Sequence, residues 1–468
     1  RRRVMWDRRL DPHLRRDLGK FRKYDGTRLR DLLRIIRNKK NHYQDMPMQL
    51  RETLGDIPEG YLHYFDSRFP YLLLHCYYFV LENDSLRTAT LRLDPTLTCG
   101  QAFRWKLTGP SEYTCAIFGH VVDLKQTPTT VLYRSLGTHC PENSSNSSSK
   151  GVLDIETSLR DYFQLEVCLE DLCNQWIQVD PSFAELKSTQ TGLRMLRQPV
   201  IENLFTFIAS SNNNIKRITM LIDRLCQRFG HPIDTTKGTF HTFPTINALA
   251  QCQDLETTFK DLGFGYRAKY YASTVRSLTD THECPESYLL GLRNKTFAEA
   301  RAELLKLSGV GPKVADCVCL MSLDKHDAVP VDTHIWQVAQ RRYVARLRSG
   351  SASMPESDGI AVPKDKQNLV RELVSQLTAG AKAPNTKSYE AAQQLIIALF
   401  GPYSGWAQGM LFSNNLNKAE SSPAKKEKKP SLKRKALAKP HLEEPKVEPE
   451  THITTTRLRS RKPRTDYI

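Results

Sequence analysis

The stretch that decides the fold is FAEARAELLKLSGVGPKVADCVCLMSLDKHDAVPVDTH, residues 297–334. Both of its halves carry apolar residues at helical spacing, and the short segment between them holds Gly309, Gly311 and Pro312. Glycine permits a tight turn and a close backbone approach, and proline suits the first position of a helix. The stretch therefore predicts a helix–hairpin–helix, whose turn presents the N–H groups of a helix N-terminus to a phosphate.

Lys313 lies at the start of the second predicted helix, where the positive end of the helix dipole disfavours another cation. Burial of the Lys313 amine against Val314, Cys317 and the partner helix would also disfavour its charged form. Both effects favour the neutral amine, which is the form that a nucleophile needs. The alternative is that Lys313 only contacts a phosphate, and from the spacing alone that alternative is favoured.

Asp332 belongs to VPVDTH (residues 329–334) and precedes the predicted helix THIWQVAQRR. Taken alone, an aspartate at this place is an N-cap. However, cleavage of an N-glycosidic bond develops positive charge on the sugar, which a fixed carboxylate stabilises while it also assists proton transfer. A lysine amine at the anomeric carbon gives a Schiff base and opens a route to strand cleavage by β-elimination. Lys313 and Asp332 together therefore predict a glycosylase site.

The charge and the cysteines limit the class of protein. The chain has 468 residues, enough for about three domains, and its formal net charge of +17 favours a polyanionic partner. Its apolar runs, such as 71–74 and 395–400, are far shorter than the ~20 residues that span a bilayer, so we expect no membrane segment. We expect no signal peptide, because no apolar run follows the basic start. The 11 scattered cysteines indicate free thiols, without a zinc module or an iron–sulfur cluster.

Periodicity and composition divide the chain into four regions. Residues 1–80 are basic with a helical pattern. Residues 84–190 alternate as antiparallel strands do in TATLRLDPTL, YTCAIFGHVVDL and TTVLYRSL. Residues 191–416 carry apolar residues at helical spacing, and the Lys-, Pro- and Ser-rich residues 417–468 predict a disordered tail.

Several motifs resemble those of a known enzyme family. LSGVGPK followed by VPVDTH is similar to the helix–hairpin–helix GPD glycosylase superfamily. Four further blocks narrow the resemblance to eukaryotic 8-oxoguanine DNA glycosylases: CGQAFRW (99–105), SSNNNIKRIT (210–219), GFGYRAKY (263–270) and GPYSGWAQGMLF (401–412). The resemblance covers about residues 84–416. It implies an α+β fold, with an antiparallel TBP-like β-sheet domain before an all-helical helix–hairpin–helix domain.

The same resemblance implies a bifunctional DNA glycosylase and AP lyase that removes 8-oxoguanine opposite cytosine, with Lys313 as the nucleophile and Asp332 as the essential acid. The residues that it assigns to the flipped base are Gly100, Cys317, Met321, Gln408 and Phe412. Phe412 offers a stacking face, and Gln408 offers an amide for the base edge. Because 8-oxoguanine has an N7–H that guanine lacks, an accepting carbonyl at Gly100 would distinguish the two bases.

Other residues are implied to bind the DNA around the base. Those assigned to the vacated stack and the unpaired cytosine are Asn212, Arg217, Tyr266 and Arg267, and those assigned to phosphate are Gly309, Gly311 and His334. The carbonyls of Leu305, Leu307 and Val310 are implied to hold a monovalent cation. No cofactor is required, and the protein is expected to bind double-stranded DNA as a monomer. The sequence departs from the family at Cys99, where serine is usual.

The first eighty residues resemble a different family. KFRKYDG (20–26), RDLLRIIRNKKNHY (30–43) and SRFPYLLLH (67–75) are similar to the KEN endoribonuclease domain of the endoplasmic-reticulum stress sensor and of RNase L. The residues that match its RNA-cleaving constellation are Tyr24, Arg37, Asn38 and His42. Composition alone favours a basic amphipathic helix. We expect a partial KEN domain from a fused or mispredicted gene, with a genuine two-enzyme fusion that also binds RNA as the alternative.

The tail contains KKEKKPSLKRK (425–435), which is spaced like a nuclear-localisation signal. A solvated or nonspecific DNA-binding tail fits the composition equally well. Because the expected substrate is nuclear DNA, the sequence favours a nuclear protein, with a mitochondrial form left open.

Overall fold

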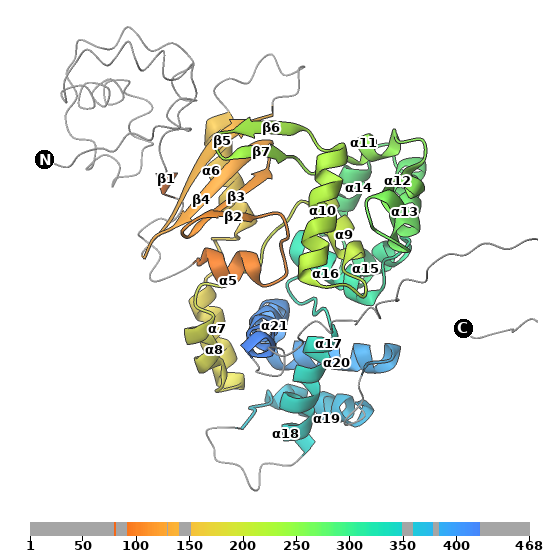
Figure 1. Ribbon diagram of the computed structural model, residues 1–468. Helices are drawn as coiled ribbons and strands as arrows, with labels where there is room; N and C mark the ends of the chain where they lie inside the picture. Colours follow the sequence, from red (N-terminus) through yellow and green to blue (C-terminus); the bar gives the residue numbers. More distant parts are fainter. Residues whose placement is uncertain are drawn as a thin grey trace, which may run out of the picture. The chain divides into compact units, whose positions relative to one another are not determined.

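The computed structural model describes residues 79–80, 91–128, 130–139, 151–348, 359–377 and 383–421 (Figure 1). The predicted RNA-cleaving residues Tyr24, Arg37, Asn38 and His42 lie outside these ranges. Residues 142–150 and the basic cluster 425–435 also lie outside them. The described residues cover the regions that were expected to hold the sheet and the helices.

An antiparallel sheet occupies the first part of the described chain. Its strands are β1 (Phe79–Val80), β2 (Lys106–Gly109), β3 (Glu112–Ile117), β4 (His120–Gln126) and β5 (Val131–Thr138), in the spatial order β1-β5-β4-β3-β2. The prediction of antiparallel strands in YTCAIFGHVVDL and TTVLYRSL is confirmed. Phe118 and Gly119 join β3 to β4 with φ of 54° and 77°, the positive values that a two-residue hairpin turn demands.

The predicted strand at TATLRLDPTL is wrong from Leu93 onward. These residues form the short helix α5 (Leu93–Thr98). Pro95 lies in the first turn, where its missing N–H breaks no helical hydrogen bond. Leu93 and Leu97 are four residues apart and both buried, so a helix puts them on one face.

Three helices follow the sheet, so strands fill only the first part of the region 84–190. They are α6 (Gly151–Tyr162), α7 (Leu169–Val179) and α8 (Phe183–Thr189). Ile155 and Leu159 of α6 share a core with Leu124 of the sheet. In contrast, α7 and α8 belong to the core of the helical region: the ring of Phe183 lies 5.1 Å from that of Phe400. This core therefore continues across residue 190.

The helices predicted between 191 and 416 are present. The structure has α9 (Val200–Ala209), α10 (Ile215–Phe229), α11 (Ile246–Ala250), α12 (Leu255–Asp261), α13 (Arg267–Thr281), α14 (Pro285–Gly291), α15 (Phe297–Leu305), α16 (Pro312–Ser322), α17 (Thr333–Val338), α18 (Ala345–Arg348), α19 (Gln367–Gln376), α20 (Thr386–Phe400) and α21 (Ser404–Ser421). Shorter helical turns are η2 (Leu292–Asn294), the π-helical η3 (Ala339–Val344), η5 (Lys364–Lys366) and η6 (Gly401–Tyr403).

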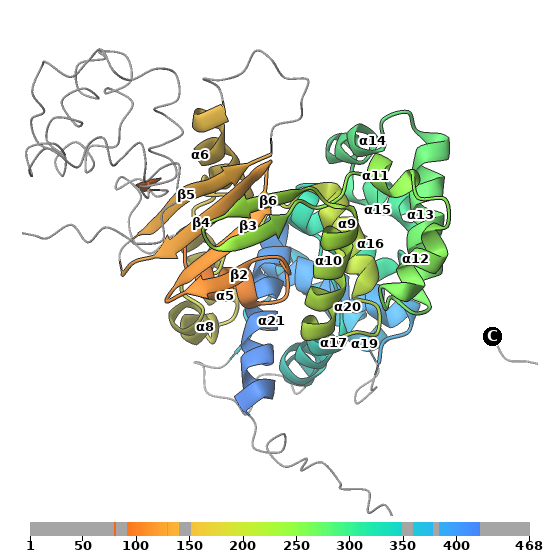
Figure 2. The same ribbon diagram turned by 45° about the horizontal axis from the view of Figure 1, so that its top comes forward.

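The expectation that this region is all helical is wrong, because β6 (Pro232–Thr235) and β7 (Gly238–His241) form a hairpin in it. Ile233 and Phe240 are cross-strand partners, and they pack on Ala116 and Val121 of the large sheet. Figure 2 shows this hairpin lying against β3 and β4. The hairpin thus covers sheet residues that would otherwise face water.

One helical stretch, 386–416, is long and apolar enough to cross a bilayer by length and composition. Of its most apolar window, 67% is buried inside the fold. Packing in the helical core accounts for its apolar residues.

Candidate active site

The predicted hairpin joins α15 to α16, which pack against each other. At Gly309 φ is +77°, and an added Cβ would lie 2.6 Å from Cβ of Tyr270, so only glycine fits. At Gly311, by contrast, such an atom would meet nothing within 4 Å among the described residues, and φ is −91°. Pro312 is the first residue of α16. The N-terminus of α16 is therefore available to an anionic group.

Lys313 is half-buried at the second position of α16. Its Nζ donates to Oγ of Ser210 at 3.2 Å and lies 4.5 Å from the ring centroid of Phe207. The Ser210 hydroxyl donates its own hydrogen to the Phe207 carbonyl at 2.7 Å, so it is an acceptor for Lys313. Both contacts come from the end of α9, which lies beside α16 (Figures 1 and 2). They hold the amine in one place, and the prediction about its charge stays a prediction.

The thiol of Cys317 lies one helical turn after Lys313 and is buried. Burial raises its pKa to about 11, although the charge of Lys313 acts to lower it, and the Asp332 carboxylate acts to raise it. Cys317 therefore remains a thiol at neutral pH and does not compete as a nucleophile.

Asp332 is the N-cap of α17, and its Oδ1 accepts the Ile335 N–H at 2.9 Å. The capping role considered for this residue is therefore present. Its Oδ2 makes no hydrogen bond with the part of the chain that the structure describes. One oxygen fixes the orientation of the carboxylate, and the other is left for a ligand.

Gly100 faces Phe412 across the predicted base pocket. A Cβ at Gly100 would lie 3.5 Å from Cε1 of Phe412 and 3.2 Å from Cδ1 of Ile215, and φ is +84°. The neighbouring thiol of Cys99 has its pKa raised to about 11 by burial, so this departure from the family introduces no reactive group. A larger residue at Gly100 would therefore crowd Ile215 and the Phe412 ring and would strain the backbone.

Gln408 and Met321 are both buried. The Gln408 side chain makes no hydrogen bond with any described residue, so its amide is available to a ligand. Met321 is fixed from two sides by Gln198, whose N–H donates to the Met321 carbonyl at 2.6 Å and whose Nε2 lies 3.5 Å from its sulfur. Nε2 of Gln198 also donates to the carbonyl of Gln101 at 2.8 Å. The residues next to Gly100 are thus tied to α16.

The loop after α9 carries the residues predicted to enter the DNA. Asn212 has a positive φ of 47°. Arg267 is buried, and its guanidinium donates to the carbonyls of Ser211 and Asn212 and stacks on Tyr266, with 4.4 Å to the ring centroid. Tyr266 is 54% exposed and also donates to Ser211, at 3.1 Å. In this structure Arg267 therefore braces the loop, and its binding of cytosine stays a prediction.

Arg217 and His334 are two further residues predicted to bind the DNA. The exposed side chain of Arg217 donates weakly to the Gly263 carbonyl at 3.4 Å, so it is available for DNA. His334 packs edge-on against Phe412 at 5.7 Å, and its Nδ1 lies 3.1 Å from Nδ2 of Asn415. The nitrogen of that amide donates, so Nδ1 of His334 is the acceptor in this contact.

The predicted cation ligands are three hairpin carbonyls, those of Leu305, Leu307 and Val310. The carbonyl of Leu307 accepts the Val310 N–H at 3.2 Å, which leaves it one lone pair for a cation. The cation stays a prediction. Among the described side chains, no group of three or more His, Cys, Asp or Glu residues is arranged to hold a metal ion.

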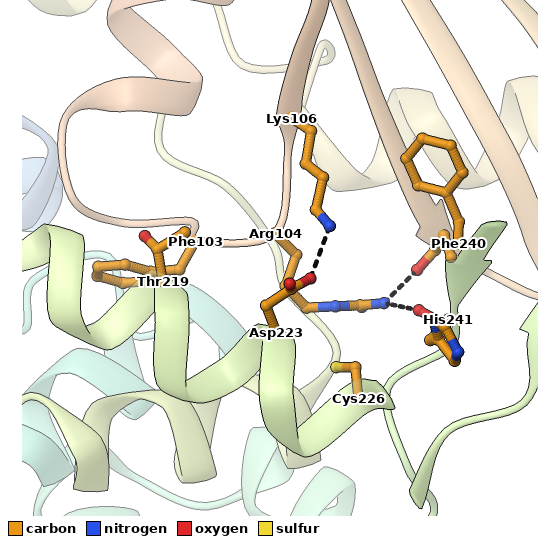
Figure 3. Close-up of a pocket in the computed structure, with 9 residues that line it drawn as sticks. Phe103, Arg104, Lys106, Thr219, Asp223, Cys226, Phe240 and His241 are labelled. Atoms are coloured by element: carbon orange, nitrogen blue, oxygen red, sulfur yellow. Dashed lines mark hydrogen bonds and ion pairs between the residues drawn. The ribbon is translucent and has the colours of Figure 1, made fainter. Parts of the chain in front are cut away.

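A separate cavity of about 30 Å³ lies between the sheet, β7 and α10 (Figure 3). This volume holds a water molecule or two and no nucleobase. Figure 3 shows Arg104 aimed at the His241 carbonyl, to which it donates at 2.7 Å, and Lys106 paired with Asp223. Arg104 also pairs with Glu202 at 2.6 Å. The cavity wall therefore joins the segment after Gly100 to α9, β7 and α10.

Sequence reasoning missed the residues that support the site. Ser210 and Phe207 hold Lys313, Gln198 holds Met321, and Asn415 orients His334. Ser210 opens the quoted block SSNNNIKRIT, so its place in a motif was the one signal available.

Comparisons with known proteins agree with this arrangement. Residues 85–204 match the family described as 8-oxoguanine DNA glycosylase, N-terminal domain, and residues 205–355 match the HhH-GPD superfamily of base-excision DNA repair proteins. The N-glycosylase/DNA lyase OGG1 of Arabidopsis thaliana is 36% identical over 322 residues, which are 69% of this chain and 76% of that protein. The Clostridium acetobutylicum 8-oxoguanine glycosylase/lyase, solved with DNA containing cytosine opposite 8-oxoG, has a TM-score of 0.53 and 25% identity, covering 71% of this chain and 94% of that one.

The first residues match different proteins, as predicted. Residues 1–91 match the Ribonuclease 2-5A family. The sensor for unfolded proteins in the ER, ire1, of Schizosaccharomyces pombe is 52% identical over 77 residues, which are 16% of this chain and 7% of that protein. The family matches over residues 85–355, together with the relative that is 36% identical over 69% of this chain, show that the chain belongs to the 8-oxoguanine DNA glycosylase family of the HhH-GPD superfamily.

Proposed function

We propose that this chain excises 8-oxoguanine paired with cytosine from duplex DNA and then cleaves the strand as an AP lyase. The observation that carries the proposal is the placement of two groups: an amine held beside the hairpin by Ser210, and a carboxylate that caps α17 with one oxygen and leaves its other oxygen without a hydrogen bond among the described residues. The family relationship supports the same N-glycosylase and lyase chemistry.

The reaction follows from these groups. Nζ of Lys313 attacks C1′ of the damaged nucleotide while the C1′–N9 bond breaks. The electron pair of the C1′–N9 bond leaves with the base, and the base takes up a proton. Asp332 stabilises the positive charge that the sugar develops. The amine nitrogen then loses one proton, and as the C1′–O4′ bond breaks, O4′ takes up a proton and the sugar ring opens to a protonated Schiff base. Removal of a C2′ proton then eliminates the 3′ phosphate, and hydrolysis of the imine returns the free lysine.

Selection of the base rests on the pocket between Gly100 and Phe412. The base stacks on Phe412, and Gln408 has an unpaired amide for its edge. The Gly100 carbonyl accepts N7–H of 8-oxoguanine, whereas guanine presents a lone pair at N7. An acceptor that meets a lone pair costs binding energy, so guanine is rejected.

Duplexes with 8-oxoguanine opposite each of the four bases test this proposal. We expect fastest base release opposite cytosine and a covalent protein–DNA adduct when borohydride is present. Undamaged guanine in the same position serves as the control and should be released at least about 1,000-fold more slowly, as expected when a site leaves a polar group unpaired. Equal release of guanine and 8-oxoguanine would contradict the proposed pocket, and absence of any adduct would contradict the lysine chemistry.

Three further properties complete the proposal. The protein binds double-stranded DNA as a monomer, with the N-terminus of α16 and Arg217 on the backbone. A monovalent cation sits on the hairpin carbonyls, and no other cofactor takes part. The protein acts in the nucleus, with the basic cluster 425–435 as its import signal.

A second candidate function is RNA cleavage by residues 1–80. The specific observation is the match of residues 1–91 to the Ribonuclease 2-5A family. In this proposal His42 moves the proton and Arg37 neutralises the phosphorane charge. Incubation of the purified chain with an RNA stem-loop tests it: we expect cleavage that is lost in His42→Ala, and an uncut stem-loop would count against an active ribonuclease.

A further inference from the structure

A buried carboxylate lies on the helix that carries Lys313. Asp316 is on α16, three residues after Lys313, and is 0% exposed. Its Oδ1 accepts Nε of Arg301 at 2.7 Å, from α15. Its Oδ2 accepts the hydroxyl of Tyr389 at 2.6 Å and Nε2 of Gln393 at 2.8 Å. Three donors from two neighbouring helices thus converge on one carboxylate.

Tyr389 and Gln393 also bind the segment that leads to Asp332. They are four residues apart on α20, so they lie on one helix face. The Tyr389 hydroxyl accepts the Val331 N–H at 3.2 Å, and Nε2 of Gln393 donates to the Val329 carbonyl at 3.0 Å. Val331 directly precedes Asp332. Each of the two side chains therefore connects Asp316 to the backbone just before the N-cap of α17.

This arrangement costs stability, which makes a positional role the better explanation. Burial of a carboxylate is unfavourable unless hydrogen bonds and charges compensate it. Burial raises the pKa of Asp316, and the charge of Arg301 and the bonds from Tyr389 and Gln393 oppose that rise. An apolar residue would fill the same core position at lower cost. It would not, however, connect α16 to the segment 329–331.

We propose that Asp316, Tyr389 and Gln393 form a clamp that fixes the Asp332 carboxylate relative to the Lys313 amine during base excision. The three act as positioning residues, since none of them needs to touch the DNA. The clamp rests on the proposed glycosylase function. Lys313 is held separately by Ser210 and Phe207, so loss of the clamp displaces the carboxylate and leaves the amine in place.

Tyr389→Phe tests the clamp, because it removes only the hydroxyl. We expect single-turnover release of 8-oxoguanine to fall about 10- to 100-fold, the scale on which small displacements of a reacting group act. Borohydride trapping on DNA that already contains an abasic site should stay within about two-fold of wild type, because that Schiff base forms without glycosidic cleavage. Gln393→Leu provides a second variant with the same expected pattern.

Tyr343→Phe is the matched control. Tyr343 is also fully buried in the helical core and also donates its hydroxyl to a buried carboxylate, Asp180 at 3.2 Å. The two Tyr→Phe variants should lose similar amounts in their temperature of unfolding, but Tyr343→Phe should release base at close to the wild-type rate. Equal slowing in both variants, or abasic trapping that falls as far as base release in Tyr389→Phe, would overturn the clamp. A wild-type chain that releases no 8-oxoguanine would overturn the proposed function and the clamp with it.

Discussion

Lys313→Gln is expected to abolish both base release and the borohydride-trapped adduct. Glutamine keeps most of the length and can still donate to Ser210, but the lone pair of its amide nitrogen is delocalised into the carbonyl and does not attack C1′. We therefore expect loss of the covalent intermediate to below detection, while binding to a duplex with an abasic site stays within about ten-fold, the effect of losing one charge near phosphate. Denaturing gels after borohydride treatment measure the adduct, and fluorescence anisotropy measures binding.

Lys306→Gln is the control for this variant. Lys306 belongs to the same hairpin, and its side chain is 67% exposed and pairs with Glu303 at the surface. The substitution changes the charge of the hairpin by the same amount, and we expect it to leave adduct formation intact. Adduct at the wild-type level in Lys313→Gln would show that the nucleophile is a different group.

Asp332→Asn is expected to lower the rate of base release by about 100- to 1,000-fold, the usual loss when one electrostatic stabiliser of a transition state is removed. Asparagine caps a helix as well as aspartate does, so the bond to the Ile335 N–H and the stability of the fold should be kept. Asp332→Ala removes the cap as well and should cost about 1 kcal/mol of stability. Single-turnover kinetics and thermal unfolding together separate the two roles.

Asp254→Asn makes the same chemical change at another N-cap. Asp254 begins α12, where it accepts the Thr257 N–H at 3.1 Å. We expect normal base release from this variant. If Asp332→Asn released base as fast as Asp254→Asn does, Asp332 would be a cap without a catalytic role.

The parts of the fold that sequence predicted are those set by local pattern. The alternation of β4 and β5 and the periodic helices around the hairpin needed no knowledge of distant residues. The wrong predictions concern elements that depend on tertiary contacts. At α5 the alternating pattern predicted a strand, but the residues form a helix that buries Leu93 and Leu97 on one face. The β6–β7 hairpin is stabilised because Ile233 and Phe240 pack on the large sheet. A local period does not reveal such partners.

The candidate site divides in the same way. Lys313 and Asp332 could be named as candidates from the sequence, because an amine and an acid at two consecutive helix starts lie in one short stretch, and their catalytic roles stay predictions. Their supports were not predictable, because they come from far along the chain: Ser210 precedes Lys313 by 103 positions, and Tyr389 follows Asp316 by 73. Only the folded chain shows that a serine at the end of α9 lies against Lys313 and that a tyrosine on α20 binds Asp316.

The contact of Phe183 with Phe400 has a consequence for how this protein can be divided. It joins α8 and α20, from the early and late parts of the described chain, in one hydrophobic core. A fragment that begins after α8 or stops before α20 would expose one half of an aromatic cluster to water. The stretch 297–334 contains both reacting groups, but the distance between them is maintained by both ends of the fold. Deletions far from the hairpin, such as loss of α8 or α20, should therefore abolish activity as fully as loss of the Lys313 amine does.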